Sequence, residues 1–252
     1  MYRTLLAKEF LEQRRTYRLF ILGAVLLVFG LISPVLAKYT PLLLRSVPGL
    51  PAGLADIIPE ATLRDAVGQY IKNISQFGVL LVIIFTMGVI AQEKERGTAA
   101  MLLTKPVRRS AMVLAKWAAG MGSLLVGLAV AAVGCALYTA LLFEPLPLLG
   151  FLALNALIGV FLGVFLSIAL LASALARSQA VAAGIAFGGL LLLLVLGSIP
   201  RLGEVMPNQL LGWGESFVLG GDATAWTALA VSFGIIVLSV LGACLRLERE
   251  EI

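Results

Sequence analysis

Six runs of apolar residues, each long enough to cross a lipid bilayer, constrain the fold of this chain more than any other feature. They are Leu19–Ala37, Ile74–Ala91, Ala118–Leu142, Leu148–Leu175, Ala180–Ile199 and Ala225–Leu245. A helix needs about 20 apolar residues to span the hydrocarbon core. Backbone polar groups in lipid must be hydrogen-bonded internally, which helices of this length achieve. We therefore predict an all-α integral membrane protein in which residues 1–252 form a single transmembrane domain.

Composition supports this interpretation and excludes several function classes. Of the 252 residues, 60% are hydrophobic and 13% are charged, whereas a soluble domain has about 25% charged residues. The chain has no histidine, which excludes histidine-ligated metals and histidine general bases. It also lacks the G-x-x-x-x-G-K-[ST] motif of ATP-binding P-loops. Cys135 and Cys244 fall within or beside apolar runs, and we expect both to be packing residues.

The first 18 residues are predicted to form an amphipathic interface helix. Leu6, Phe10 and Tyr17 recur at helical spacing, and charged residues that include Lys8 and Glu9 occupy other faces. A basic amphipathic helix next to a span normally lies in the membrane interface. A signal peptide is the alternative, but residues 19–37 are longer than its apolar core of about 7–15 residues.

Two longer connections are expected on one side of the membrane, at residues 38–73 and 200–224. Prolines and glycines mark both as loops. From Thr62 an amphipathic pattern returns, and it predicts a helix that lies on the membrane surface and continues into the second span. Glu144–Pro147 marks a tight reversal between the third and fourth spans.

The distribution of cations predicts the orientation of the chain. Six spans place both termini on one side. If that side is the cytoplasm, the segments there hold 14 of the 19 Lys and Arg residues, and the outer segments hold 5. Cytoplasmic loops are enriched in cations. We therefore predict that the N-terminus and the C-terminus are both cytoplasmic.

The interior of the spans offers packing residues and no acid or base near its centre. Charged residues within a membrane are the usual mark of ion-coupled transport, so this class loses support. Asn155 is expected to bond to a neighbouring helix. The pairs Gly159/Gly163 and Gly184/Gly188 allow close helix approach, either at a subunit interface or, as we favour, within one bundle.

The longest polar interruption, Glu93–Trp117, lies on the predicted cytoplasmic side and contains six cations. Thr98 can cap a short helix over residues 99–103, which Pro106 would end. Ser110 can cap a second helix that becomes the third span. The result would be a short cytoplasmic helix across the ends of two spans. A simple charged loop that anchors the two spans is an equally open interpretation of these residues.

This stretch resembles the hallmark of ABC-2 type transporter permeases, E-x-E-[RK]-G-T-x-x-x-L-L-[ST]-x-P-[VI]-x-R followed by a Gly-Lys pair. Ala115 replaces the glycine of that pair, before Lys116. The Lys8-Glu9 pair and the six-span layout also match, so the resemblance covers the whole chain. The matching residues of the stretch are Glu93, Glu95, Arg96, Gly97, Thr98, Leu102, Leu103, Pro106, Arg109 and Lys116.

The resemblance implies the permease subunit of an ATP-binding cassette exporter in the cytoplasmic membrane. It implies that the short helix within residues 92–117 is the coupling helix, that the matching residues dock on a separate ATPase, and that Lys8 and Glu9 support them. The ATPase would hold ATP and magnesium, and this chain would bind no cofactor. Further implied partners are a second permease copy or a related permease, and membrane lipids. Nucleic acid is not expected as a partner.

A second function remains open at this point. The same stretch would suit a non-transporting membrane anchor or mechanical coupler for a cytoplasmic ATPase or assembly factor. A membrane enzyme is a weaker candidate, because the bundle lacks paired acids and a nucleophile with its base. Nothing in the spans selects a cargo.

Overall fold

The computed structural model describes residues 2–46, 59–96 and 108–249, and the regular structure within these ranges is helical. Six helices, counting α4 and α5 as one, are long and apolar enough to cross a membrane, which confirms the predicted fold class. The helices are α1 (Tyr2–Arg15), α2 (Arg18–Arg45), α4 (Leu63–Thr86), α5 (Ala91–Glu95), α7 (Arg109–Leu142), α8 (Leu148–Leu175), α9 (Gln179–Ser198), α10 (Pro200–Gly203), α11 (Gln209–Leu219) and α12 (Trp226–Glu248).

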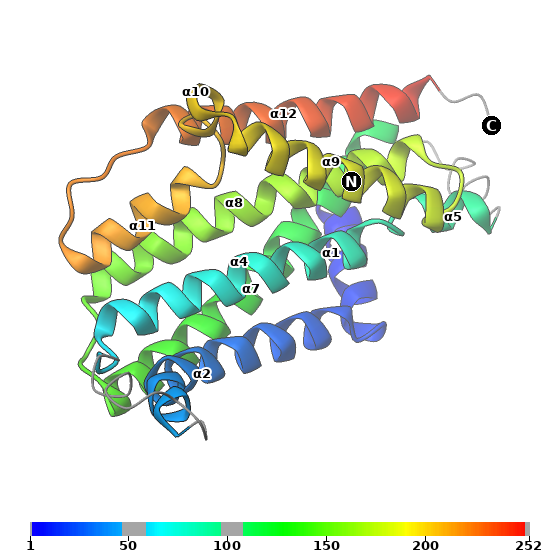
Figure 1. The fold of residues 1–252 in the computed structure, drawn as a ribbon. Coiled ribbons are helices and arrows are strands. Elements are labelled where there is room, and N and C mark those ends of the chain that lie inside the picture. The colour runs from blue at the N-terminus through cyan, green and yellow to red at the C-terminus, as the bar shows by residue number, and fades with distance from the viewer. Residues whose placement is uncertain (1, 47–58, 97–107, 250–252) are drawn as a thin grey trace.

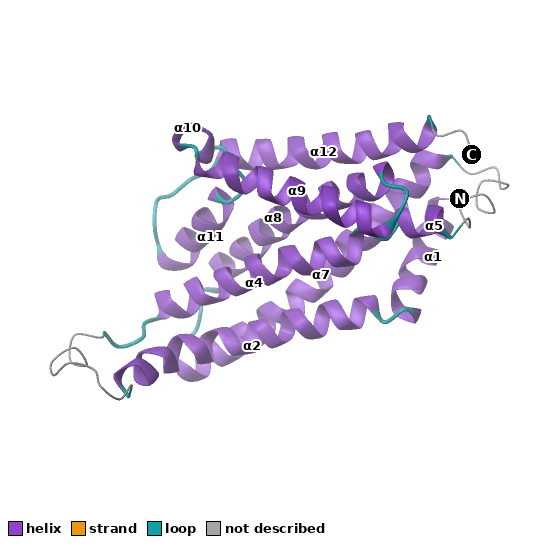
Figure 2. Cartoon of the chain, turned by 45° about the vertical axis from the view of Figure 1, so that its right-hand side comes forward, coloured by secondary structure: helices purple, strands orange, loops and turns teal. Residues whose placement is uncertain are grey.

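The long helices run alternately up and down a bundle (Figure 1). We call one end the α1 end, because α1, α5 and the last turn of α12 lie there, and the opposite end the α11 end. Both views show α1 crossing the direction of the long helices (Figures 1 and 2). Within the most apolar window of each helix, 78% of α8 is buried but only 11% of α9. The core is therefore centred on α8, and α9 is peripheral.

The long helix α2 extends beyond its predicted end. Residues 38–45, expected in a loop, continue the helix through Pro34 and Pro41 to Arg45. Leu42, Leu43 and Leu44 are apolar, and an apolar surrounding favours a helix because its backbone hydrogen bonds are internal. Prolines were therefore misleading as loop markers here. At the other end, Tyr17 separates α1 from α2 in a left-handed conformation with φ 57°.

The amphipathic stretch after Thr62 forms one continuous helix with the second span, as predicted. The Thr62 N–H donates to Oδ2 of Asp65 at 2.7 Å, which caps the start of α4. The apolar face does not lie on a membrane surface, because Val67, Tyr70 and Ile74 are buried in the main core. Residues 63–73 of the expected outer loop are therefore part of the bundle.

The expected loop 200–224 contains two helices. In α11, Gly214 faces Leu154 of α8, and the carbonyl group of Phe217 lies against Gly150. The rings of Trp213 and Trp226 meet edge to face, with centroids 4.8 Å apart. The absence of side chains at two glycines lets α11 pack along α8, so this segment is a structural part of the bundle.

The third span begins earlier than its apolar run. Helix α7 starts at Arg109, and Arg108 is its N-cap residue. Ser110, predicted as the cap, lies inside the first turn. The predicted coupling helix at residues 99–103 lies outside the described residues.

The polar and small residues of the spans pack in two different ways. Asn155 bonds to a neighbouring helix, as predicted, because its Oδ1 accepts from the Tyr70 hydroxyl at 2.7 Å. Gly159 and Gly163 pack against side chains of α7 within the bundle. No described atom lies within 4 Å of a Cβ built at Gly184 or Gly188. The expectation of packing within one bundle therefore does not hold for the second glycine pair.

Candidate functional site

The candidate site is formed by the two segments that flank residues 97–107. The first flanking segment is α5, which follows a turn after α4. The Oγ of Ser173, near the end of α8, accepts hydrogen bonds from the backbone N–H groups of Ile90 (2.9 Å) and Ala91 (3.0 Å). Lys94 Nζ donates to the carbonyl oxygen of Ala174 at 2.6 Å. A cation at a helix C-terminus is favourable, so α5 is fastened to the end of α8.

A third contact fastens α5 to the start of α9. The Glu95 carboxylate accepts from the backbone N–H of Gln179, the first residue of α9, at 3.1 Å. The side chains of Gln92 and Gln179 lie 3.4 Å apart. An anion at a helix N-terminus satisfies a free N–H group and complements the helix dipole. The short helix α5 therefore holds the ends of two spans through complementary charges.

The second flanking segment is the first turn of α7, which contacts a different helix, α12. Arg109 donates from a guanidinium nitrogen to the carbonyl oxygen of Leu247 at 3.0 Å, in the last turn of α12. The Cys244 thiol lies 3.9 Å from the carbonyl oxygen of Ser110. The two ends of the undescribed segment are therefore attached to different spans, α5 to α8 and α9, and α7 to α12.

A buried cluster of charges joins the two ends to α1. Lys116 Nζ of α7 lies 2.7 Å from Glu93 Oε1 of α5 and 3.4 Å from Glu9 Oε2 of α1. The Lys116 side chain is 3% exposed, against 10% for Glu9 and 21% for Glu93. A buried ammonium is tolerated only when it is paired and hydrogen-bonded. Glu9, Glu93 and Lys116 are called the Lys116 cluster below.

Lys8 supplies a second cation to this cluster. Its Nζ lies 3.3 Å from Glu9 Oε1 and 3.6 Å from Glu12 Oε2. Burial lowers the pKa of Lys8, but the carboxylates of Glu9 and Glu12 raise it more, so the net pKa lies above its ordinary value. Glu9 thus has two ammonium partners, Lys8 and Lys116.

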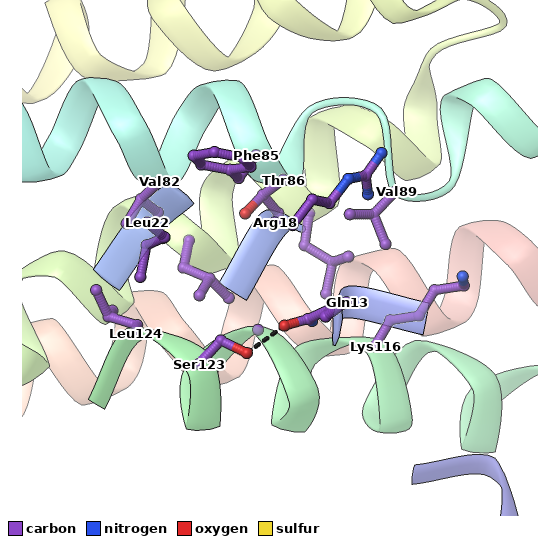
Figure 3. A pocket seen from close by; sticks show the side chains of 13 residues that line it. Gln13, Arg18, Leu22, Val82, Phe85, Thr86, Val89, Lys116, Ser123 and Leu124 are labelled. Atoms are coloured by element: carbon purple, nitrogen blue, oxygen red, sulfur yellow. Dashed lines mark hydrogen bonds between the residues drawn. The ribbon is translucent and has the colours of Figure 1, made fainter. Parts of the chain in front are cut away.

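Two small cavities border the Lys116 cluster. One, of about 50 Å³, reaches from Lys116 and Arg18 into the apolar space between α2, α4 and α8. Figure 3 shows its lining, including the hydrogen bond that Ser123 donates to Gln13 of α1. The other, also of about 50 Å³, lies between α1 and the turn before α5, and Thr16, Gly88 and Gln92 line it. Each has room for a few water molecules.

The structure brings together part of the predicted site. Glu9, Glu93 and Lys116 meet in the cluster with Lys8 beside them, and Glu95 and Arg109 bind the ends of α9 and α12. Arg96 is exposed. Gly97, Thr98, Leu102, Leu103 and Pro106 lie outside the described residues. Contact of any of these residues with an ATPase stays a prediction.

Sequence reasoning missed three contributors to the site. They are Lys94, Ser173 and Gln179, to which the sequence analysis assigned no role. Within residues 2–46, 59–96 and 108–249, no three His, Cys, Asp or Glu side chains gather as a metal site. Lys94 and Glu95, which follow Glu93 directly, are the local signal in the sequence that could have indicated contacts with helix ends.

Comparison with known families identifies the family of this chain. The model of a family described as "ABC-2 family transporter protein" matches residues 3–211, from α1 into α11. This chain belongs to the ABC-2 transporter family. Membership confirms the resemblance seen in Glu93–Lys116, and it makes the chain a multi-pass membrane component of a family whose members typically lack catalytic activity of their own.

A distant relative aligns with nearly the whole chain. The chain is 24% identical over 241 residues to a protein of Bacillus subtilis (strain 168) named "Uncharacterized transmembrane protein YxlG". The alignment includes 94% of this chain and 92% of the relative. The similarity therefore extends through the full set of six long helices.

Proposed function

We propose that this chain is the permease subunit of an ABC transporter that couples ATP hydrolysis by a separate ATPase to export across the cytoplasmic membrane. One observation carries the proposal: the two flanks of residues 97–107 are fastened to different spans. A partner that moved this segment would pull on α8 and α9 through α5, and on α12 through Arg109.

The charges at the α1 end support its assignment to the cytoplasm. Arg14 and Arg15 end α1, Arg177 connects α8 to α9, and Arg246 lies in the last turn of α12. Cations concentrate on the cytoplasmic side of membrane proteins. In this orientation both termini and the coupling segment face the ATPase, and α1 lies in the inner interface among lipid headgroups.

The chain itself would bind neither ATP nor magnesium. Both belong to the ATPase, because the sequence lacks a P-loop. Six spans provide half of a two-subunit pathway, so a second copy or a related permease completes the transporter. The exposed surface of α9, where Gly184 and Gly188 have no described neighbour within 4 Å, is available to lipids or to that subunit.

The test is co-purification from cells. We expect the tagged chain to retain an ABC-type ATP-binding subunit, and we expect Gly97→Trp combined with Pro106→Ala to abolish retention while the permease still inserts. Lys72→Met, at an exposed cation of α4, is the matched control and should retain the subunit. Failure of the wild-type chain to retain an ATPase, or retention by the double variant, would contradict the proposal.

Transport itself is tested in vesicles. ATP-dependent movement of a cargo into or out of vesicles that contain the complex supports the permease. A complex that binds and hydrolyses ATP but moves nothing from the mixture of cell metabolites and lipids offered would favour the non-transporting mechanical coupler. The contacts of α5 and Arg109 would serve that function as well.

A further inference from the structure

The Lys116 cluster carries an inference about how α1 is linked to the rest of the bundle. Its three charged groups come from three elements far apart in sequence, α1, α5 and α7. Glu93 lies in the last helix before residues 97–107, and Lys116 lies in the first turns of the helix after them. The ammonium therefore joins both flanks of the coupling segment to one another and to the N-terminal helix.

The link between α1 and α5 consists of the ion pairs of Lys116 with Glu9 and Glu93, which lie beside a cavity. Helix α1 packs on α7, where the ring of Phe10 lies against Gly122 and Gln13 accepts from Ser123. Between α1 and the turn before α5 there is a cavity, lined in part by Glu12, Thr16 and Gly88. Ion pairs through Lys116 cross that space. The cavity leaves room for α1 to move relative to α5, and the ion pairs through Lys116 keep the two helices connected.

The two arms of the cluster differ. The Lys116–Glu93 distance is 2.7 Å and the Lys116–Glu9 distance is 3.4 Å. If α1 moves away, Glu9 keeps the Lys8 ammonium as a partner at 3.3 Å. A buried charge is costly when it loses its partner. Lys116, whose side chain is 3% exposed, would lose a partner if either arm opened, so both arms oppose separation.

We propose that Lys116 is a positioning residue that makes α1 follow the coupling segment: its ammonium holds Glu93 tightly and carries Glu9, and with it α1. The proposal for Lys116 rests on the proposed function, because the ATPase would supply the movement of the coupling segment. The link itself is a property of the chain alone. Helix α1 lies across the spans and leads directly into α2, so its displacement changes the position of the first span.

The experiment measures the position of α1 by pulsed electron–electron double resonance in lipid nanodiscs. Spin labels are placed at Leu11→Cys on α1 and Phe217→Cys on α11, which are 46% and 47% exposed, with Cys135→Ala and Cys244→Ala as background. The test variant combines Glu9→Gln, Glu93→Gln and Lys116→Met, because replacing a whole buried ion cluster by neutral groups is often tolerated by the fold. Lys116→Arg keeps the charge, and Lys72→Met is the control at an exposed lysine.

The first comparison uses the permease alone. We expect a single narrow distance distribution for the wild-type background, Lys116→Arg and Lys72→Met, and a broad one for the neutral triple variant. An equally narrow distribution in the triple variant, at unchanged thermal stability, would overturn the proposal without touching the proposed function. A triple variant that fails to fold is replaced by Glu9→Gln alone, which removes the ion pair between α1 and Lys116 and should broaden the distribution.

The second comparison adds the ATP-binding subunit that co-purifies with the chain, with and without ATP. We expect ATP to shift the Leu11–Phe217 distance in the wild-type background and in Lys116→Arg. In the triple variant we expect normal subunit binding and ATP hydrolysis but loss of the shift. A shift that persists in the triple variant, or is absent from the wild-type background, would overturn the role of Lys116. Absence of any co-purifying subunit would instead contradict the proposed function and leave the first comparison as the deciding one.

Discussion

The hydroxyl group of Tyr70 in α4 donates a 2.7 Å hydrogen bond to Oδ1 of Asn155 in α8. Asn155 Nδ2 donates in turn to the carbonyl oxygen of Phe151, within its own helix. Tyr70 is fully buried, and its ring lies beside that of Phe151, with centroids 5.6 Å apart. This polar contact between the central helix and a neighbour can be removed without changing the volume of the core.

We therefore expect Tyr70→Phe to destabilise the protein by about 1 kcal/mol, the usual size of a hydrogen bond between membrane helices. The measurement is unfolding in mixed detergent micelles followed by circular dichroism. Tyr138→Phe, at an exposed tyrosine of α7, is the control and should leave the unfolding midpoint unchanged. Equal midpoints for wild type and Tyr70→Phe would show that the contact contributes nothing.

The approach of α2 to α7 at Gly30 gives a second prediction. A Cβ at this position would overlap the backbone carbonyl oxygen of Ala131. We expect Gly30→Ala to cost about 1–3 kcal/mol, because the two helices must separate to admit a methyl group. On the same helix, a Cβ at Gly23 meets no atom within 4 Å. Gly23→Ala should therefore be neutral or slightly stabilising, and a loss of stability equal to that of Gly30→Ala would contradict the packing described here.

The attachment of α5 to α8 predicts a local effect on hydrogen exchange. Ser173→Ala removes the acceptor of two buried N–H groups, those of Ile90 and Ala91. An unsatisfied buried donor costs about 1–3 kcal/mol. We expect amide exchange in a peptide that covers residues 87–96 to rise by about tenfold or more, since about 1.4 kcal/mol corresponds to a factor of ten, measured by mass spectrometry.

Two further variants at serine positions complete that measurement. Ser173→Thr keeps the hydroxyl oxygen and should exchange more slowly than Ser173→Ala. Ser198→Ala removes an exposed hydroxyl that bonds within its own helix to Leu194, and it should leave residues 87–96 unaffected. Unchanged exchange in Ser173→Ala would mean that other contacts fix α5.

The proposed orientation predicts which connections a membrane-impermeant maleimide can label in intact cells. Arg177 and Asp222 are both exposed. Arg177 belongs to the connection between α8 and α9 and Asp222 to the connection between α11 and α12, and these two connections lie at opposite ends of the bundle (Figure 1). With Cys135→Ala and Cys244→Ala as background, we expect Asp222→Cys to react in intact cells. Arg177→Cys should react only after permeabilisation. The reverse pattern would place α1 and the coupling segment on the outer side.

The spans were predictable because a run of about 20 apolar residues in lipid must satisfy its backbone hydrogen bonds internally, as a helix does. The bounds predicted for α8, Leu148–Leu175, are those of the structure. The errors arose where a helix does not end at the edge of its apolar run. Pro41 was taken to end α2, but a single lost hydrogen bond does not stop a helix in apolar surroundings. Residues 209–219 were taken as loop because their glycines suggest turns, whereas they admit the close packing of α11 on α8.

The candidate site was predictable in location but not in geometry. A family motif identifies Glu93, Glu95, Arg109 and Lys116 without saying which way each side chain points. Gln179 and Leu247, the partners of Glu95 and Arg109, offer backbone groups at helix ends, and backbone groups carry no signature in the sequence. The pairing of Lys116 with Glu9 crosses 107 positions. Only the folded arrangement of α1 against α7 brings the two residues together.

Tyr17 forms the corner between α1 and α2 in a left-handed conformation. The strain of this conformation opposes the ion pairs of the Lys116 cluster. A residue with a Cβ pays about 1–2 kcal/mol for such a conformation, and Tyr17 has φ 57°. That cost persists only while contacts of α1 with α7 hold the corner in place. Release of Glu9 from Lys116 would let the corner relax, so stored backbone strain favours the departure of α1 and ion pairing favours its return. The backbone strain at Tyr17 and the ion pairs of Glu9 therefore act on α1 in opposite directions.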